Sequence, residues 1–164
     1  MPTVDGVDRL IEQYQLGLEE FVKGNPEAVK KLFSHRDDVT LANPLGPPAR
    51  GWEQVTKTIE HAASNIRDGE ITSFDVISKL VTAELAYIVW IERQKAKMGA
   101  RQDVTPVDLR VTMIFRPEDG DWKIVHLGAR RRRRGPVGSR TVFRTARPTV
   151  PTLCRYPSGF PRIV

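Results

Sequence analysis

The stretch from Arg36 to Trp52, RDDVTLANPLGPPARGW, decides the fold of this chain. Two acids lead into the β-branched and apolar run Val39-Thr40-Leu41, which predicts a short strand. An Asn-Pro step and a Gly-Pro-Pro turn then interrupt the run before a new helix. Because Pro44 favours an extended backbone at Asn43, we expect the Asn43 amide to be presented from a strand end or a loop.

Helical periodicity lies on both sides of this stretch. The first helix is predicted by Val7, Leu10, Ile11, Tyr14, Leu18, Phe21 and Val22, with Asp5 as its cap and Gly24-Asn25 as its end. Asn25-Pro26 then predicts a second helix, which buries Ala28, Val29, Leu32 and Phe33. The third is predicted by Trp52, Val55, Ile59, Ala62, Ala63 and Ile66, and Asp68-Gly69 is expected to stop it.

The second half of the chain has the patterns of strands. Residues 71–78 and 107–116 alternate between two faces, whereas Leu85 to Ile91 is almost wholly apolar, as in a strand buried on both faces. The sequence PEDG at 117–120 predicts a turn before a last strand from Trp122 to Leu127. Helices followed by hairpin-linked strands predict an α+β fold, with three N-terminal helices in the concave face of a curved, mostly antiparallel sheet.

The charges divide the chain into two parts. All 20 acids lie at or before Asp121, and 16 of the 26 Lys and Arg lie at or before Gly128. Residues 1–128 therefore carry a net charge of −4, and residues 129–164, which hold 10 Arg, carry +10. We expect one domain at 1–128 and an Arg-, Pro- and Gly-rich tail at 129–164, disordered or loosely packed. A nucleic-acid partner would depend on that tail alone.

Two motifs carry a family resemblance. The first is D-D-x-T-x-x-N-P-x-G at Asp37 to Gly46, and the second is DGDWKIVH at Asp119 to His126. With the helices and strands around them, they make residues 7 to 126 similar to the nuclear transport factor 2-like superfamily, in particular to its SnoaL-like and ketosteroid-isomerase-like members. The resemblance implies a cone that encloses an apolar pocket, and a homodimer formed through the sheet.

The resemblance also assigns expected catalytic positions. Ketosteroid isomerase uses an Asp as the base that removes a proton from the substrate, and a Tyr and a protonated Asp hold the oxyanion that forms. Asn43 aligns with this Asp base, and an amide side chain cannot accept a proton at neutral pH. Tyr14 lies one helical turn from the expected tyrosine position. Thr105-Pro106-Val107-Asp108 resembles the segment with the protonated acid, although strand parity directs Asp108 to the outer face unless a bulge intervenes.

The candidate catalytic residues are thus His126, Asn43 and Asp108. His126 is separated from Trp122 and Ile124 by even numbers of residues, so we expect all three on the same face of the last strand. It would be either a general acid or base or an ordinary hydrogen-bonded histidine. Asn43 either binds a ligand or fixes the loop through an Asx-turn. The expected ligand-binding residues are Tyr14, Leu18, Asn43, Trp52, Ile59, Val89, Ile91, Met113, Phe115 and Trp122.

Other chemistry has little support in the sequence. His35, Asp37 and Asp38 lack any established metal-ligand spacing, and there is no phosphate-binding loop and no catalytic triad order. We expect no metal and no cofactor. The one cysteine, Cys154, the lack of an apolar run of about 20 residues and the acidic start predict a cytoplasmic protein without a membrane anchor.

The tail has a second interpretation. The tail contains Arg, Pro, Gly and Ala but no Lys, Asp or Glu. GC-rich coding sequence gives this composition when it is read out of frame. Family members commonly end in His-Ala-Asp, and codons permitted for Leu127 to Arg132 encode that ending one base later. Sequencing the gene around codon 127 separates a native tail from a shifted one.

The sequence therefore predicts a cone domain that binds a small, largely apolar molecule. Acid–base chemistry around Asn43 and His126 would make it an isomerase, cyclase or hydratase. The alternative is a non-catalytic ligand-binding or dimerisation module of the same fold.

Overall fold

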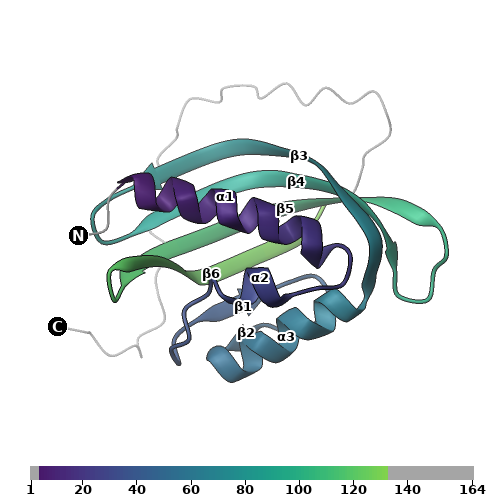
Figure 1. The fold of residues 1–164 in the computed structure, drawn as a ribbon, viewed down its shortest axis with the longest axis horizontal. Helices are drawn as coiled ribbons and strands as arrows, with labels where there is room; N and C mark the ends of the chain where they lie inside the picture. The colour runs from purple at the N-terminus through teal and green to yellow at the C-terminus, as the bar shows by residue number, and fades with distance from the viewer. Residues whose placement is uncertain (1–3, 133–164) are drawn as a thin grey trace, which may run out of the picture. The chain divides into compact units, whose positions relative to one another are not determined.

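A six-stranded sheet and three helices make up residues 4–132, the part of the chain that the computed structural model describes (Figure 1). The expected tail lies outside these residues, apart from its first four positions. The elements in chain order are α1 (Val4–Phe21), α2 (Glu27–Lys30), β1 (Thr40–Ala42), β2 (Ala49–Arg50), α3 (Trp52–Ser64), β3 (Ile66–Val81), β4 (Ala86–Met98), β5 (Val104–Glu118) and β6 (Asp121–Arg131).

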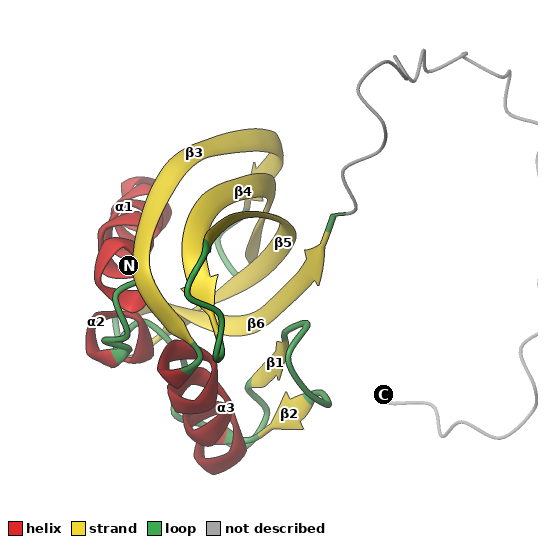
Figure 2. Ribbon diagram, turned by 90° about the vertical axis from the view of Figure 1, so that its right-hand side faces the viewer, coloured by secondary structure: helices red, strands yellow, loops and turns green. Residues whose placement is uncertain are grey.

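The strands form one sheet in the order β2-β1-β6-β5-β4-β3. Neighbouring strands are antiparallel, except that β1 runs parallel to β6. The sheet is strongly curved, as Figure 2 shows, and α1 packs against its inner face. This architecture confirms the predicted α+β cone. None of the described helices is long and apolar enough to cross a membrane.

The core forms between α1 and the inner face of the sheet. The apolar stripe of α1 is buried, and the ring of its Tyr14 lies 5.9 Å from that of Trp90 on β4. Trp90, Met113 and Phe115 are fully buried beneath the helix. Burial of each such side chain contributes about 2 to 3 kcal/mol.

The stretch from Arg36 to Trp52 joins the helices to the sheet. Its predicted strand is β1, which pairs with the end of β6, and its loop leads through β2 into α3. Asp38 accepts two hydrogen bonds from the guanidinium of Arg116 on β5, at 2.6 and 3.1 Å. Arg116 also contacts the buried Glu118, whose carboxylate accepts a hydrogen bond from Ser34. Asp38 of this motif is thus part of a structural ion-pair network.

The second helix is shorter than its apolar pattern predicts. α2 has a single turn, with the Asn25 side chain accepting the N–H of Glu27 at 3.2 Å. Leu32 and Phe33 leave the helix because their backbone joins the sheet. The Leu32 carbonyl accepts the N–H of Ile124, and Phe33 forms a parallel bridge with the same residue.

The expected stop at Asp68-Gly69 is wrong, because α3 ends at Ser64 and β3 already begins at Ile66. Asp68 has a φ of 49°, and the pairing register of β3 shifts between Arg67 and Glu70. The Gly69 N–H donates to the carbonyl of Val22 at the end of α1. A Cβ at residue 69 would lie 2.5 Å from that carbonyl oxygen, so the glycine permits this close approach.

A β-bulge divides β6 into two parts. Ile124 pairs with Phe115 and His126 pairs with Ile114, so Val125 is the additional residue. After the bulge β6 continues beside β1 and β5 as far as Arg131, beyond the boundary expected at residue 128. This extension belongs to the sheet and contributes to the site described next.

Candidate functional site

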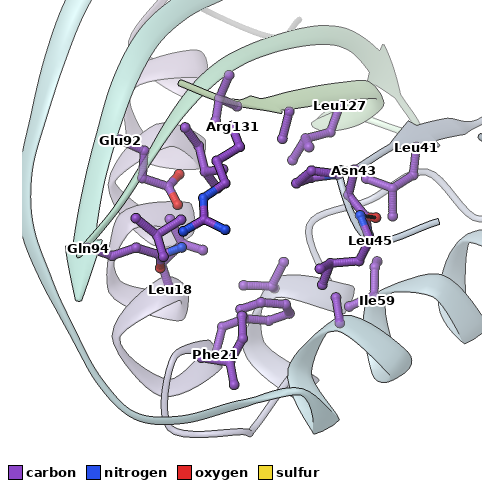
Figure 3. Close-up of a pocket in the computed structure, with 18 of the residues that line it drawn as sticks. Leu18, Phe21, Leu41, Asn43, Leu45, Ile59, Glu92, Gln94, Leu127 and Arg131 are labelled. Carbon is purple, nitrogen blue, oxygen red and sulfur yellow. Dashed lines mark hydrogen bonds between the residues drawn. The ribbon is translucent and has the colours of Figure 1, made fainter. Parts of the chain in front are cut away.

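An apolar cavity of about 170 Å³ lies between the helices and the inner face of the sheet. α1 contributes Tyr14, Leu18 and Phe21 to its wall, and α3 contributes Ile59 and Ala62. The strands contribute Leu41 of β1, Val107, Leu109 and Val111 of β5, and Leu127 and Ala129 of β6. Four polar side chains also line the cavity, namely Asn43, Glu92, Gln94 and Arg131 (Figure 3).

Strand alternation brings Glu92 and Gln94 to the cavity. β4 directs Ile88, Trp90, Glu92, Gln94 and Ala96 to the inner face, and all five are buried. Glu92 is only 3% exposed and Gln94 only 5%. Two polar side chains at such depth require a structural or chemical reason, because burial without hydrogen bonds destabilises the fold.

Glu92 has the most unusual electrostatics of the cavity. Burial raises the pKa of its carboxyl group from 4.5 to about 7, and the nearby Trp90 N–H lowers it only in part. Neither Glu92 Oε2 nor Trp90 Nε1 has a hydrogen-bond partner among residues 4–132. A carboxyl group that titrates near neutral pH can both take up and release a proton under ordinary conditions.

Tyr14 is the second proton-bearing group at this wall. Its side chain is 4% exposed and lines the cavity from α1. Burial, and then the negative charge of ionised Glu92, raise the pKa of its phenol well above the usual value. Tyr14 therefore stays protonated and can act as a hydrogen-bond donor.

Asn43 forms the Asx-turn considered for it, and its binding of a ligand stays a prediction. Its Oδ1 accepts the N–H of Leu45 at 2.9 Å, which is an Asx-turn, and the residue also lines the cavity. The carbonyl oxygen of the amide thus holds the loop. The NH₂ group is the part of Asn43 that has no role in this turn.

The expectation that His126 shares a face with Trp122 and Ile124 is wrong. The bulge at Val125 reverses the alternation, so that Leu127 faces the cavity and His126 faces outward. His126 Nδ1 lies 2.8 Å from the hydroxyl of Thr40 on β1, and partial burial lowers the pKa of the imidazole. The position fits the alternative of an ordinary hydrogen-bonded histidine.

Asp108 also lies away from the cavity. Its neighbours Val107 and Leu109 both line the cavity, and Asp108 pairs in register with Arg93 on the outer face. β4 and β5 pair without a register shift, so no bulge turns the carboxylate inward. The geometry gives no support to the catalytic roles predicted for Asp108 and His126.

The expected ligand-binding residues separate into three groups. Tyr14, Leu18, Asn43 and Ile59 line the cavity, whereas Met113, Phe115 and Trp122 belong to the packed core beside it. Val89 and Ile91 lie on the outer face, because the inner positions of β4 are those of Trp90 and Glu92. Trp52 stacks on His35, with 3.9 Å between the ring centroids, and does not line the cavity.

Glu92, Gln94 and Arg131 line the cavity but are not among the residues predicted from the sequence. Glu92 and Gln94 follow the apolar run Leu85 to Ile91, and the signal for them is the continued alternation up to Ala96. Arg131 was assigned to the tail. No group of three or more His, Cys, Asp or Glu within residues 4–132 is arranged to hold a metal ion, and this includes the cluster at His35.

Comparisons with known proteins agree with this fold. No curated protein with a significantly similar sequence was found. A nuclear transport factor 2-like superfamily protein from Salmonella enterica serovar Typhimurium aligns with a TM-score of 0.66 and 17% identity, over 80% of this chain and 92% of that protein. At this identity the likeness shows the fold alone.

Two further solved structures have the same fold. One is a putative dehydratase of the NTF2-like family from Streptomyces avermitilis, with a TM-score of 0.62, 18% identity and coverage of 77% of this chain and 96% of that one. The other is a ketosteroid isomerase-like protein from Erwinia carotovora atroseptica, with a TM-score of 0.61, 18% identity and coverage of 78% and 95%. A family model for the SnoaL-like domain matches residues 11–129. The chain belongs to the SnoaL-like domain family.

Proposed function

We propose that this protein binds a small, largely apolar carbonyl compound in the cavity and moves a proton on it, with Glu92 as the proton carrier. The observation that carries the proposal is a buried carboxyl group with a pKa of about 7 and an unpartnered oxygen at the wall of an apolar cavity. General acid–base catalysis is most effective when the pKa of the group lies near the working pH.

The size of the cavity limits the ligand. A volume of about 170 Å³ is close to that of an engineered cavity of about 150 Å³ that holds benzene, and it is below the roughly 300 Å³ at which pockets for drug-sized ligands begin. A molecule with one ring fits this volume. A steroid, with four fused rings, does not.

Tyr14 and Asn43 supply the remaining chemistry. The protonated phenol of Tyr14 and the NH₂ group of Asn43 are hydrogen-bond donors at the cavity wall. Such donors stabilise the negative charge that forms on a carbonyl oxygen when a neighbouring carbon loses a proton. Isomerisation of an unsaturated ketone and dehydration of a β-hydroxy carbonyl compound both begin with this step. The similar solved structures include a putative dehydratase and a ketosteroid isomerase-like protein.

Exchange of α-protons tests the proposal without knowledge of the natural substrate. Cyclohexanone in D₂O, followed by NMR, should lose its α-protons faster with the protein than with buffer alone. Glu92→Gln should reduce that excess rate by about 100-fold or more, since general acid–base groups contribute about 10² to 10⁴. Glu84→Gln is the matched control, because Glu84 is exposed in the β3–β4 turn. Equal rates for wild type and Glu92→Gln would refute the role of Glu92.

The alternative is a ligand-binding module without catalysis. It is favoured by Asn43, which stands where the resemblance places a catalytic carboxylate. Binding of a one-ring ligand without any exchange above the buffer rate would support this alternative.

A further inference from the structure

We propose that the ligand carries a carboxylate, and that Arg131 binds this group at the mouth of the cavity. This inference rests on the proposed function in one respect, which is that a small apolar molecule occupies the cavity. It adds the chemical class of that molecule, namely a one-ring organic acid.

The position of Arg131 is the first argument. Arg131 pairs with Leu109 near the end of β6, and both residues line the cavity. Figure 3 shows its side chain reaching from the strand into the cavity, toward the side of Gln94 and Glu92. The residue as a whole is exposed, so Arg131 lies where the cavity opens to solvent.

The lack of an internal partner is the second argument. Arg131 forms no ion pair with any carboxylate of residues 4–132. If it were the counter-ion of Glu92, the positive charge would lower the pKa of that carboxyl group. The pKa of Glu92 is instead raised, with burial as the main cause. The remaining residues, 133–164, contain no Asp or Glu.

The surrounding charge is the third argument. Arg131 is shared between the cavity and a shallow depression whose other lining residues are Arg110, Arg130 and Arg132. The four arginines around this depression create a positive potential next to Arg131, and this potential attracts an anion. An Arg fork matches the two oxygens of a carboxylate, and the apolar walls hold the hydrocarbon body.

The geometry gives the bound molecule a direction. Its carboxylate lies at Arg131, and its ring extends toward Leu41 and Ile59 on the opposite side of the cavity (Figure 3). The proton-carrying Glu92 lies on the same side of the cavity as the Arg131 side chain (Figure 3).

Paired probes test the inference. 3-Phenylpropionate and its neutral analogue 3-phenylpropionamide have nearly the same size, so calorimetric titration of both isolates the effect of the charge. We expect the full-length protein to bind the carboxylate about 10-fold more tightly than the amide. Arg131→Gln should remove this difference by weakening the carboxylate alone. Arg101→Gln is the matched control, since Arg101 is exposed in the β4–β5 turn and lines neither the cavity nor the depression.

The outcomes separate this inference from the proposed function. If both probes bind equally well to the wild type, or if Arg131→Gln weakens both to the same extent, the assignment of a carboxylate is wrong and occupation of the cavity stands. If neither probe binds, the proposed function fails, and the inference fails with it. Circular dichroism of each variant establishes that the fold is intact.

Discussion

Replacing Glu92 by Gln should change how the stability of the protein depends on pH. In the folded chain the pKa of Glu92 is about 7, compared with 4.5 for an unburied glutamate. Between these two values the folded state holds a proton that the unfolded state has released. Folding stability therefore decreases as the pH rises from 4.5 to about 7, and this contribution stays constant above that range.

The magnitude follows from the two pKa values. Each pKa unit corresponds to 1.36 kcal/mol, so ionisation of Glu92 in the folded protein costs about 3 kcal/mol. Glutamine has nearly the same shape and does not ionise. We therefore expect the free energy of unfolding of Glu92→Gln, relative to wild type, to increase by about 3 kcal/mol between pH 4.5 and pH 7.5.

Urea denaturation followed by tryptophan fluorescence, at several pH values, measures this difference. Subtracting the wild-type curve cancels the contributions of all other titrating groups. Glu84→Gln removes an exposed carboxyl group, and its difference from wild type should stay nearly constant. If the Glu92→Gln difference is also constant from pH 4.5 to 7.5, Glu92 is not the buried, weakly acidic group on which the proposed mechanism depends.

Three other predictions follow from the packing and charges. Gly69→Ala should destabilise the fold by about 1 to 3 kcal/mol, because the new methyl group meets the carbonyl of Val22, whereas Gly46→Ala meets no atom within 4 Å and should leave the melting temperature unchanged. Asp38→Asn should cost at most about 1 kcal/mol at pH 7, since the pair with Arg116 is half exposed. Hydrogen bonds from Arg116 lower the pKa of Asp38, so this cost should shrink as the pH falls below 3.8 and be absent in strong acid. Light scattering should give the mass of a dimer, as the family resemblance implies, and a monomer at all concentrations would contradict it.

The sequence predicted the fold because its signals agree at several levels. The break at Asn43-Pro44, the helical stripes and the alternation of the last strands all require the same arrangement of helices and sheet. The boundaries were less accurate where tertiary contacts override local preference. The backbone of Leu32 and Phe33 bonds to the sheet, and the backbone of Gly69 bonds to the end of α1.

The candidate site was harder to predict, because it depends on which face each strand residue occupies. An almost wholly apolar run such as Leu85 to Ile91 has no alternation, so Val89 and Ile91 could not be distinguished from Trp90 by pattern. The bulge at Val125 has no clear sequence signal, and it turned His126 outward. Arg131 resembled the rest of an Arg-rich run and nothing local indicated a strand.

The bulge in β6 has a consequence for how the gene can change. Loss of one residue in a regular strand turns every later side chain to the opposite face. In β6, deletion of Val125 would remove only the residue that has no pairing partner on β5. Leu127, Ala129 and Arg131 would keep their face, and Trp122 and Ile124 would keep theirs. This position of the sheet can therefore lose a codon and still present the same cavity wall.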